Sequence, residues 1–310
     1  KAAEAAEAEE ALLKEQEREF KAARRYDGGG RSSSSRTSSR GLTASMFSRS
    51  ASNRTASMMR VSSRPRGQRA WQVWHDSDET IRLGISSCLL GQKVRFDGGH
   101  KHDRIITDSL GKLFDFHPVC PETSAGLGIP RPTIRLVESG NGLVVRGAKK
   151  PDLDVTVPLA DASAKIVSRL PRVAGFILKK DSPSCGVFRV KIYREDGHPS
   201  RAETRGEFTH QLLTAQPWLP VEEEGRLNDP VLRENFIERI FTLNRYRSGP
   251  AAERKPRALM RFQATHKFLL MSHSAKHATE LGRMAAAATR STMESSLADY
   301  EALLLRTLKL

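Results

Sequence analysis

Three cysteines are the residues of this chain best suited to chemistry. Each lies at the end of a short stretch of sequence that begins with an apolar run. They are Cys88, Cys120 and Cys185, with 31 residues between the first two and 64 between the last two. In an open α/β sheet the ligand crevice lies beyond the carboxyl ends of the strands. We therefore expect the three thiols to meet at one edge of a sheet, although they are distant in the sequence.

The cysteine pattern allows two interpretations. It contains no Cys-x-x-Cys pair, and spacing alone favours buried structural cysteines, because free cysteine is among the most buried residue types. The local sequences favour ligands, because prolines and a glycine set the loop geometry around Cys120 and Cys185. Three thiolates without a fourth suit an iron–sulfur cluster with one open iron, or a metal ion with one exchangeable position.

Four polar residues near the thiols are candidate catalytic groups: Asp97, Glu122, Ser182 and Ser184. A carboxylate beside a metal centre can act as a general acid or base, and a hydroxyl can orient a substrate atom. The alternative is turn chemistry, since Asp-Gly and Ser-Pro are common turn sequences. Glu122 is the stronger functional candidate, because it sits in a loop directly after a buried strand.

The histidines are weaker candidates. His100 and His102 follow a glycine pair near Cys88, and with three thiols present we interpret them as loop residues. His266, His273 and His277 have near-helical spacing, and no pattern of carboxylates accompanies them. We interpret these three as surface or packed residues.

Apolar periodicity predicts an α/β fold, a Rossmann-like layered domain with a mostly parallel sheet. After residue 228 the pattern becomes all-helical, and we expect a small second domain that is incomplete at the end of this chain. We assign residues 80–227 to the first domain and 228–310 to the second. The expected strands are 81–86, 116–119, 173–178, 188–193, an edge strand at 218–221 and a hairpin at 133–137 and 142–146; the expected helices are 103–114, 159–170, 208–215, 231–246, 258–272, 276–288 and 293–308.

One segment, residues 28–75, supplies nine of the fifteen net positive charges of the chain. Residues 28–75 contain nine arginines and no acidic residue, in a Ser/Arg-rich sequence of low complexity. We interpret residues 1–79 as a mostly disordered basic arm, and binding to RNA or another anionic surface is its alternative function. Because the chain starts with Lys1, we expect a fragment or an extended gene model.

Composition excludes some classes of protein. No apolar run approaches the roughly 18 residues of a membrane helix, so we expect no membrane span. An odd number of cysteines does not make a disulfide framework, which favours a reducing, cytoplasmic compartment.

Five motifs together resemble the thiouracil desulfurase family, and the resemblance runs from about residue 83 to residue 221. Phe96 stands where the family more often has tyrosine. The helical part resembles the YbgA-type domain that often follows this family, in a truncated form. The motifs are Ser87-Cys88-Leu89-Leu90-Gly91, Arg95-Phe96-Asp97-Gly98, Pro118-Val119-Cys120-Pro121-Glu122, Gly126-Leu127-Gly128-Ile129-Pro130-Arg131 and Ser182-Pro183-Ser184-Cys185-Gly186.

The resemblance implies a 4Fe-4S cluster held by Cys88, Cys120 and Cys185, with an open fourth iron that takes the sulfur of a thiolated nucleobase. Water would then replace sulfur at carbon without a redox change, helped by Asp97, Glu122 and Ser184, with Ser182 behind them. The alternative is an iron–sulfur or metal-binding module, such as a sulfur carrier or sensor, that has no turnover of its own.

Overall fold

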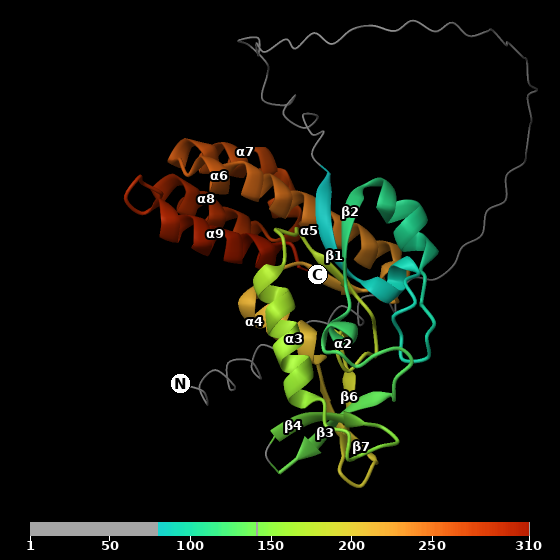
Figure 1. The fold of residues 1–310 in the computed structure, drawn as a ribbon. Helices are drawn as coiled ribbons and strands as arrows, with labels where there is room; N and C mark the ends of the chain where they lie inside the picture. Colours follow the sequence, from blue (N-terminus) through green and yellow to red (C-terminus); the bar gives the residue numbers. More distant parts are fainter. Residues whose placement is uncertain (1–79, 141, 310) are drawn as a thin grey trace, which may run out of the picture. The chain divides into compact units, whose positions relative to one another are not determined.

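The computed structural model describes residues 80–140 and 142–309 (Figure 1). The predicted basic arm, residues 1–79, and its suggested binding to nucleic acid lie outside the described residues. No helix in the described ranges is long and apolar enough to cross a membrane.

A four-stranded parallel sheet lies at the centre of the α/β part of the chain. Its strand order is β2-β1-β5-β8, and every neighbouring pair is parallel. The parallel sheet was predicted, although β8 lies about two residues beyond the expected position. The strands are β1 (Ile81–Ser86), β2 (Phe114–Val119), β5 (Phe176–Leu178) and β8 (Val221–Glu223).

Two apolar layers cover this sheet. On one face, Leu83 and Ile85 of β1 pack with Phe236 and Ile240 of the long helix α5 (Pro230–Ser248). On the other face, Phe176 packs edge-to-face on Phe208, with ring centroids 5.4 Å apart. Phe208 belongs to α4 (Glu207–Ala215), which lies beside α3 (Thr156–Arg169) (Figure 1).

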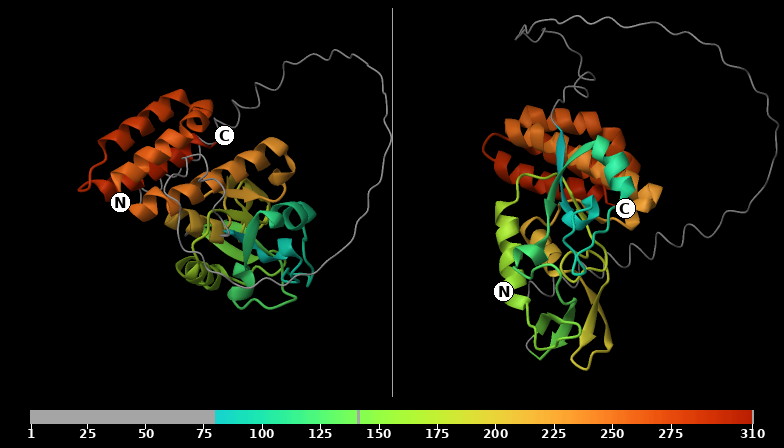
Figure 2. Two further views of the ribbon diagram at one scale, coloured as in Figure 1. Left: turned by 90° about the horizontal axis from the view of Figure 1, so that it is seen from above. Right: turned by 45° about the vertical axis from the view of Figure 1, so that its right-hand side comes forward.

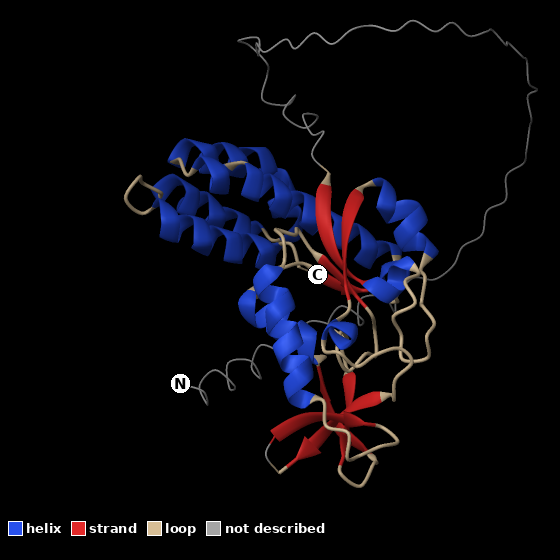
Figure 3. Ribbon diagram, in the orientation of Figure 1, coloured by secondary structure: helices blue, strands red, loops and turns tan. Residues whose placement is uncertain are grey.

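A second sheet of mixed direction was not predicted. The hairpin was expected, and so was a strand at 188–193, but that strand pairs with the hairpin instead of the parallel sheet. Figure 3 shows the two sheets as separate groups of strands. The second sheet has the order β4-β3-β6-β7, with β3 (Ile134–Ser139), β4 (Gly142–Gly147), β6 (Val190–Arg194) and β7 (Pro199–Thr204).

The segment 103–114 is helical but irregular. It forms a π-helical turn at Ile105–Ser109 and a 3-10 turn at Leu110–Lys112. Asp103 caps it, because its Oδ1 accepts hydrogen bonds from the N–H groups of Ile105 and Ile106 at 3.0 and 3.2 Å.

The C-terminal part is all-helical, as predicted (Figure 2). Asp229 caps α5, since its Oδ1 accepts from the N–H of Val231 at 2.8 Å. Tyr246, near the end of α5, stacks on Tyr300 and belongs to the helical core. Helix α5 therefore contributes to the core under the sheet and to the helical core. The remaining helices are α6 (Pro250–Glu253), α7 (Pro256–His273), α8 (Ala275–Ala287) and α9 (Met293–Thr307).

A substitution at Gly84 of β1 tests how closely this strand packs against Phe176. A Cβ at this position would lie 2.1 Å from the ring of Phe176, so Gly84→Ala should destabilise the fold by about 1–3 kcal/mol or more. Urea unfolding measures the change. Gly140→Ala is the matched control, because no atom lies within 4 Å of its Cβ. Equal unfolding midpoints for both variants would contradict this packing.

Candidate active site

The three cysteines line one cavity at the carboxyl edge of the parallel sheet. Cys88 follows β1, Cys120 follows β2, and Cys185 lies in the loop after β5. The cavity has a volume of about 360 Å³, and all three residues line it. Cys88 and Cys185 are buried, whereas Cys120 is partly exposed. The meeting of the thiols expected from the strand pattern is therefore present in the structure.

Cys88 is held in a 3-10 turn, Ser87–Leu90. Its carbonyl oxygen accepts hydrogen bonds from the N–H groups of Gly91 and Lys101, at 3.3 and 2.9 Å. Gly91 has φ +87°, which a glycine adopts without strain. Burial raises the pKa of the Cys88 thiol to about 11, with a further contribution from Cys120, while Arg95 and Lys179 oppose the shift.

Cys120 directly precedes the short helix α2 (Pro121–Ser124). Its carbonyl oxygen accepts hydrogen bonds from the Thr123 hydroxyl and from the N–H of Ser124, both at 3.1 Å. Pro121 suits the first position of this helix, where its missing N–H costs nothing. The thiol therefore lies at a fixed point between the strand and the helix.

The loop of Cys185 is fixed by local hydrogen bonds. The Ser182 hydroxyl accepts from the N–H groups of Ser184 and Cys185, at 3.2 and 3.1 Å. The Thr209 hydroxyl donates to the carbonyl oxygen of Cys185 at 2.8 Å. A Cβ at Gly186 would lie 2.3 Å from the side chain of Val190, so glycine is needed for the close approach. Burial raises the pKa of the Cys185 thiol, although a hydrogen bond with the Ser86 hydroxyl lowers it.

The end of strand β8 anchors the same loop from outside. The Glu223 carboxylate accepts hydrogen bonds from the N–H groups of Val187 and Phe188, at 2.8 and 3.1 Å. Glu224 pairs with Lys179, and its Oε2 accepts from the N–H of Lys180 at 2.8 Å. Two adjacent glutamates therefore hold both ends of the Cys185 loop against the sheet.

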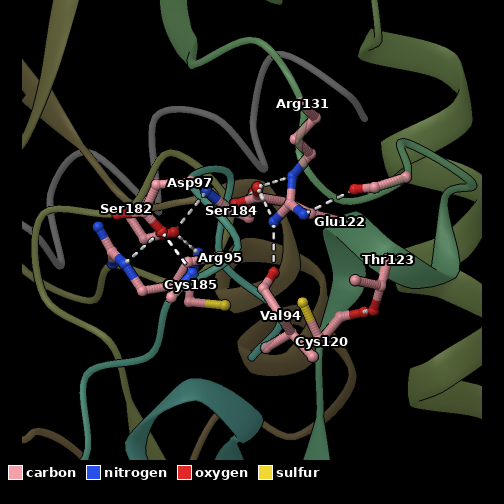
Figure 4. Close-up of polar contacts among 12 residues, drawn as sticks. Val94, Arg95, Asp97, Cys120, Glu122, Thr123, Arg131, Ser182, Ser184 and Cys185 are labelled. Carbon is pink, nitrogen blue, oxygen red and sulfur yellow. Dashed lines mark hydrogen bonds and ion pairs between the residues drawn. The ribbon is translucent and has the colours of Figure 1, made fainter. Parts of the chain in front are cut away.

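The carboxylate of Glu122, a residue of the cavity lining, accepts hydrogen bonds from two other side chains (Figure 4). Its Oε2 accepts from Nε and Nη2 of Arg131, at 2.9 and 2.7 Å, and its Oε1 accepts from the Ser184 hydroxyl at 2.9 Å. The side chain of Arg131 is only 4% exposed. These hydrogen bonds fix the orientation of the Glu122 side chain through both of its oxygens.

The other predicted catalytic residues occupy different positions. Ser182 lines the cavity, and fully buried Ser184 reaches it through its hydrogen bond to Glu122. Asp97 does not line the cavity; its side chain is half exposed, and its Oδ1 accepts from the N–H of Gly99 at 2.9 Å. That backbone hydrogen bond is the main cause of a lowered pKa of Asp97. Asp97 therefore has the geometry of a turn residue.

The histidines do not line the cavity. Nδ1 of His100 accepts from the N–H of His102, and the His102 ring bonds to Thr107. Buried His266 stacks on Phe262, and the ring of His273 bonds to Glu238. These contacts agree with the interpretation of the histidines as loop and packing residues.

The cavity wall also carries residues that sequence reasoning missed. Arg131 belongs to a recognised motif, but no role was assigned to it. Four other cations line the cavity, against the carboxylates of Glu122 and Asp181, so the wall is net positive and suits an anionic occupant. Arg95 also belongs to a recognised motif, whereas no motif contains Lys101, Lys179 or Lys180. The four cations are Arg95, Lys101, Lys179 and Lys180.

The distances between the cysteine thiols decide whether they can bind a single metal ion or a metal cluster. In the described ranges, no three His, Cys, Asp or Glu residues are grouped closely enough to hold a metal ion. In a 4Fe-4S cluster each cysteine thiolate binds a different iron, so the thiols stand further apart than around one ion. Cys120 and Cys185 point toward the same space in Figure 4. Three thiols that line one cavity are a donor set of the kind that such a cluster uses.

Comparisons with known proteins agree with the motifs. Residues 83–224 match the model of the 2-thiouracil desulfurase family, and residues 267–310 match that of a protein family of unknown function, DUF1722. A solved structure described as the 4Fe-4S-dependent thiouracil desulfidase TudS is 30% identical, with a TM-score of 0.38. The match covers 49% of this chain and 95% of that one. No curated protein matches.

The family match covers all three cysteine loops and the parallel sheet except for the first two residues of β1. The resemblance inferred from the motifs is therefore confirmed, and the DUF1722 match falls within the helical part that resembles the YbgA-type domain. This chain belongs to the 2-thiouracil desulfurase family.

Proposed function

We propose that this protein removes sulfur from a thiolated pyrimidine or a similar thiocarbonyl compound, using a 4Fe-4S cluster held by Cys88, Cys120 and Cys185. One observation carries the proposal: three thiols from three separate strand ends line a single cavity. Membership of the desulfurase family and the printed description of TudS support the same activity and cofactor.

The residues present fit this cluster. Three cysteine ligands leave one iron of a four-iron cluster without a protein ligand. The cluster with its thiolates carries negative charge, which Arg95, Lys101 and Lys179 in the cavity wall offset. Since burial favours the protonated thiols of Cys88 and Cys185, binding of the metal must release their protons.

When bound, such a cluster supplies a Lewis-acidic iron for the sulfur of a thiocarbonyl group. The overall reaction converts C=S and water into C=O and hydrogen sulfide, so a C–O bond forms, the C–S bond breaks and no electrons are transferred. Glu122 is suited to orient the water and accept its proton, because its carboxylate lines the cavity and keeps a free lone pair on Oε1.

The two serines support this arrangement. Ser184 donates to Oε1 of Glu122, and this directs the carboxylate. Ser182 keeps the Cys185 loop in place through its two backbone hydrogen bonds. Asp97 lies outside the cavity lining, so we assign it a smaller contribution, through the turn that carries Arg95 and Phe96.

The cysteine set is tested by metal content and turnover. Anaerobically reconstituted protein should contain about four irons and four acid-labile sulfides per chain, and it should release sulfide from 2-thiouracil. Changing Cys88, Cys120 or Cys185 to Ser should lower iron content and abolish sulfide release. His102→Ala is the control for an alternative ligand near Cys88 and should keep its iron. A fully active Cys120→Ser protein would rule out the proposal; full iron with no sulfide release would favour the non-catalytic module.

The role of Glu122 is tested by kinetics. Glu122→Gln keeps an acceptor for Ser184 but removes the base, so kcat should fall by about 10²–10⁴-fold with cluster absorbance unchanged. Asp97→Asn is the comparison, with a fall of less than about tenfold expected for a residue outside the lining. Sulfide release measures both. A larger fall in kcat for Asp97→Asn than for Glu122→Gln would indicate that Asp97, and not Glu122, is the base.

A further inference from the structure

Arg131 is a buried cation that the proposed chemistry does not use. Its side chain is 4% exposed, and it lies in the loop before β3. Besides the two hydrogen bonds to Glu122, its Nη1 donates to the carbonyl oxygen of Gly128 at 3.0 Å and its Nη2 to that of Val94 at 2.9 Å. Its backbone N–H donates to the carbonyl oxygen of Phe96 at 2.9 Å.

These contacts join three segments of the cavity wall. Val94 and Phe96 lie in the loop that follows Cys88. Glu122 lies two residues after Cys120, and Ser184 directly precedes Cys185. The hydrogen bonds therefore run from the first cysteine loop through Arg131 and Glu122 to the third. We call Arg131, Glu122 and Ser184 the brace.

We infer that Arg131 is a positioning residue: through the brace it fixes the three cysteine loops against one another before any metal binds, and it directs the Glu122 carboxylate into the cavity. The first half of this inference concerns the metal-free chain alone. The second half rests on the proposed function.

The contacts require an arginine at this position. The planar guanidinium holds a carboxylate and two carbonyl oxygens at the same time, in directions set by its fork. A lysine keeps the positive charge, but its three donors on one nitrogen cannot span these acceptors. Arg131→Lys therefore separates the geometry of the brace from its charge.

The first test uses metal-free protein under reducing, anaerobic conditions, with a thiol-specific chromogenic disulfide as the probe. In the native chain, partly exposed Cys120 should react first, and buried Cys88 and Cys185 should react slowly. In Arg131→Lys the two slow phases should become about tenfold faster, because loosened loops open more often. Arg146→Lys is the matched control: Arg146 lies on β4 and pairs with Asp154, so this change should leave the rates unchanged.

A second variant keeps the test decisive if Arg131→Lys folds poorly. Ser184→Ala removes only the last hydrogen bond of the brace, and it should also accelerate the reaction of Cys185. The double variant should react no faster than Arg131→Lys alone, because both changes break the same connection. Native reaction rates in both single variants would overturn the inference.

The final readout uses the reconstituted enzyme. Arg131→Lys should keep its cluster absorbance, lower kcat by about tenfold or more and change KM by less than about threefold, since a misdirected base affects turnover and not binding. An unchanged kcat would overturn the second half. If native protein releases no sulfide at all, the proposed function fails, while the thiol rates still decide the role of the brace.

Discussion

The parallel direction of the four strands in the first sheet is the constraint on which the site depends. Parallel strands all end at the same edge, so the segments that follow β1, β2 and β5 come together there. One antiparallel strand in this set would place its cysteine at the opposite edge. A long crossover that includes the β3–β4 hairpin and α3 lies between Cys120 and Cys185 and allows this direction to be kept.

The shared direction of the strands brings the three cysteine loops to one edge, but it does not position them to the accuracy that a metal cluster needs. The structure adds backbone hydrogen bonds to each cysteine loop and carboxylate anchors from two sides. Glu223 and Glu224 hold the Cys185 loop from the edge strand β8, and Glu122 reaches Ser184 from the Cys120 side. Charged groups thus have two effects at the site: the cations in the cavity wall complement an anionic occupant, and the carboxylates limit the motion of the loops around the cavity.

The helical part is tied to the desulfurase-like part through one helix. Phe236 and Ile240 of α5 fill the core beneath the parallel sheet, while Tyr246 of the same helix belongs to the helical core. Arg247, near the end of α5, also donates a hydrogen bond to the carbonyl oxygen of Val173, a short distance before β5 in the sequence. The same arginine pairs with Glu301 of α9. Local unfolding of α5 would therefore disturb the strands that the cysteine loops follow.

The sequence by itself predicted the parallel sheet, the longer α-helices and the three loops that carry the cysteines. Apolar runs followed by Cys88, Cys120 and Cys185 are local signals, and the caps at Asp103 and Asp229 follow from local backbone geometry. The pairing of β6 with the hairpin and the existence of β7 were decided only in the tertiary structure, because strand pairing depends on contacts between distant segments. The same holds for the brace: Arg131 meets Glu122 nine residues away and Ser184 lies 62 residues from that carboxylate. Hydrogen-bond partners at such separations leave no periodic trace in a sequence, so only the folded chain reveals them.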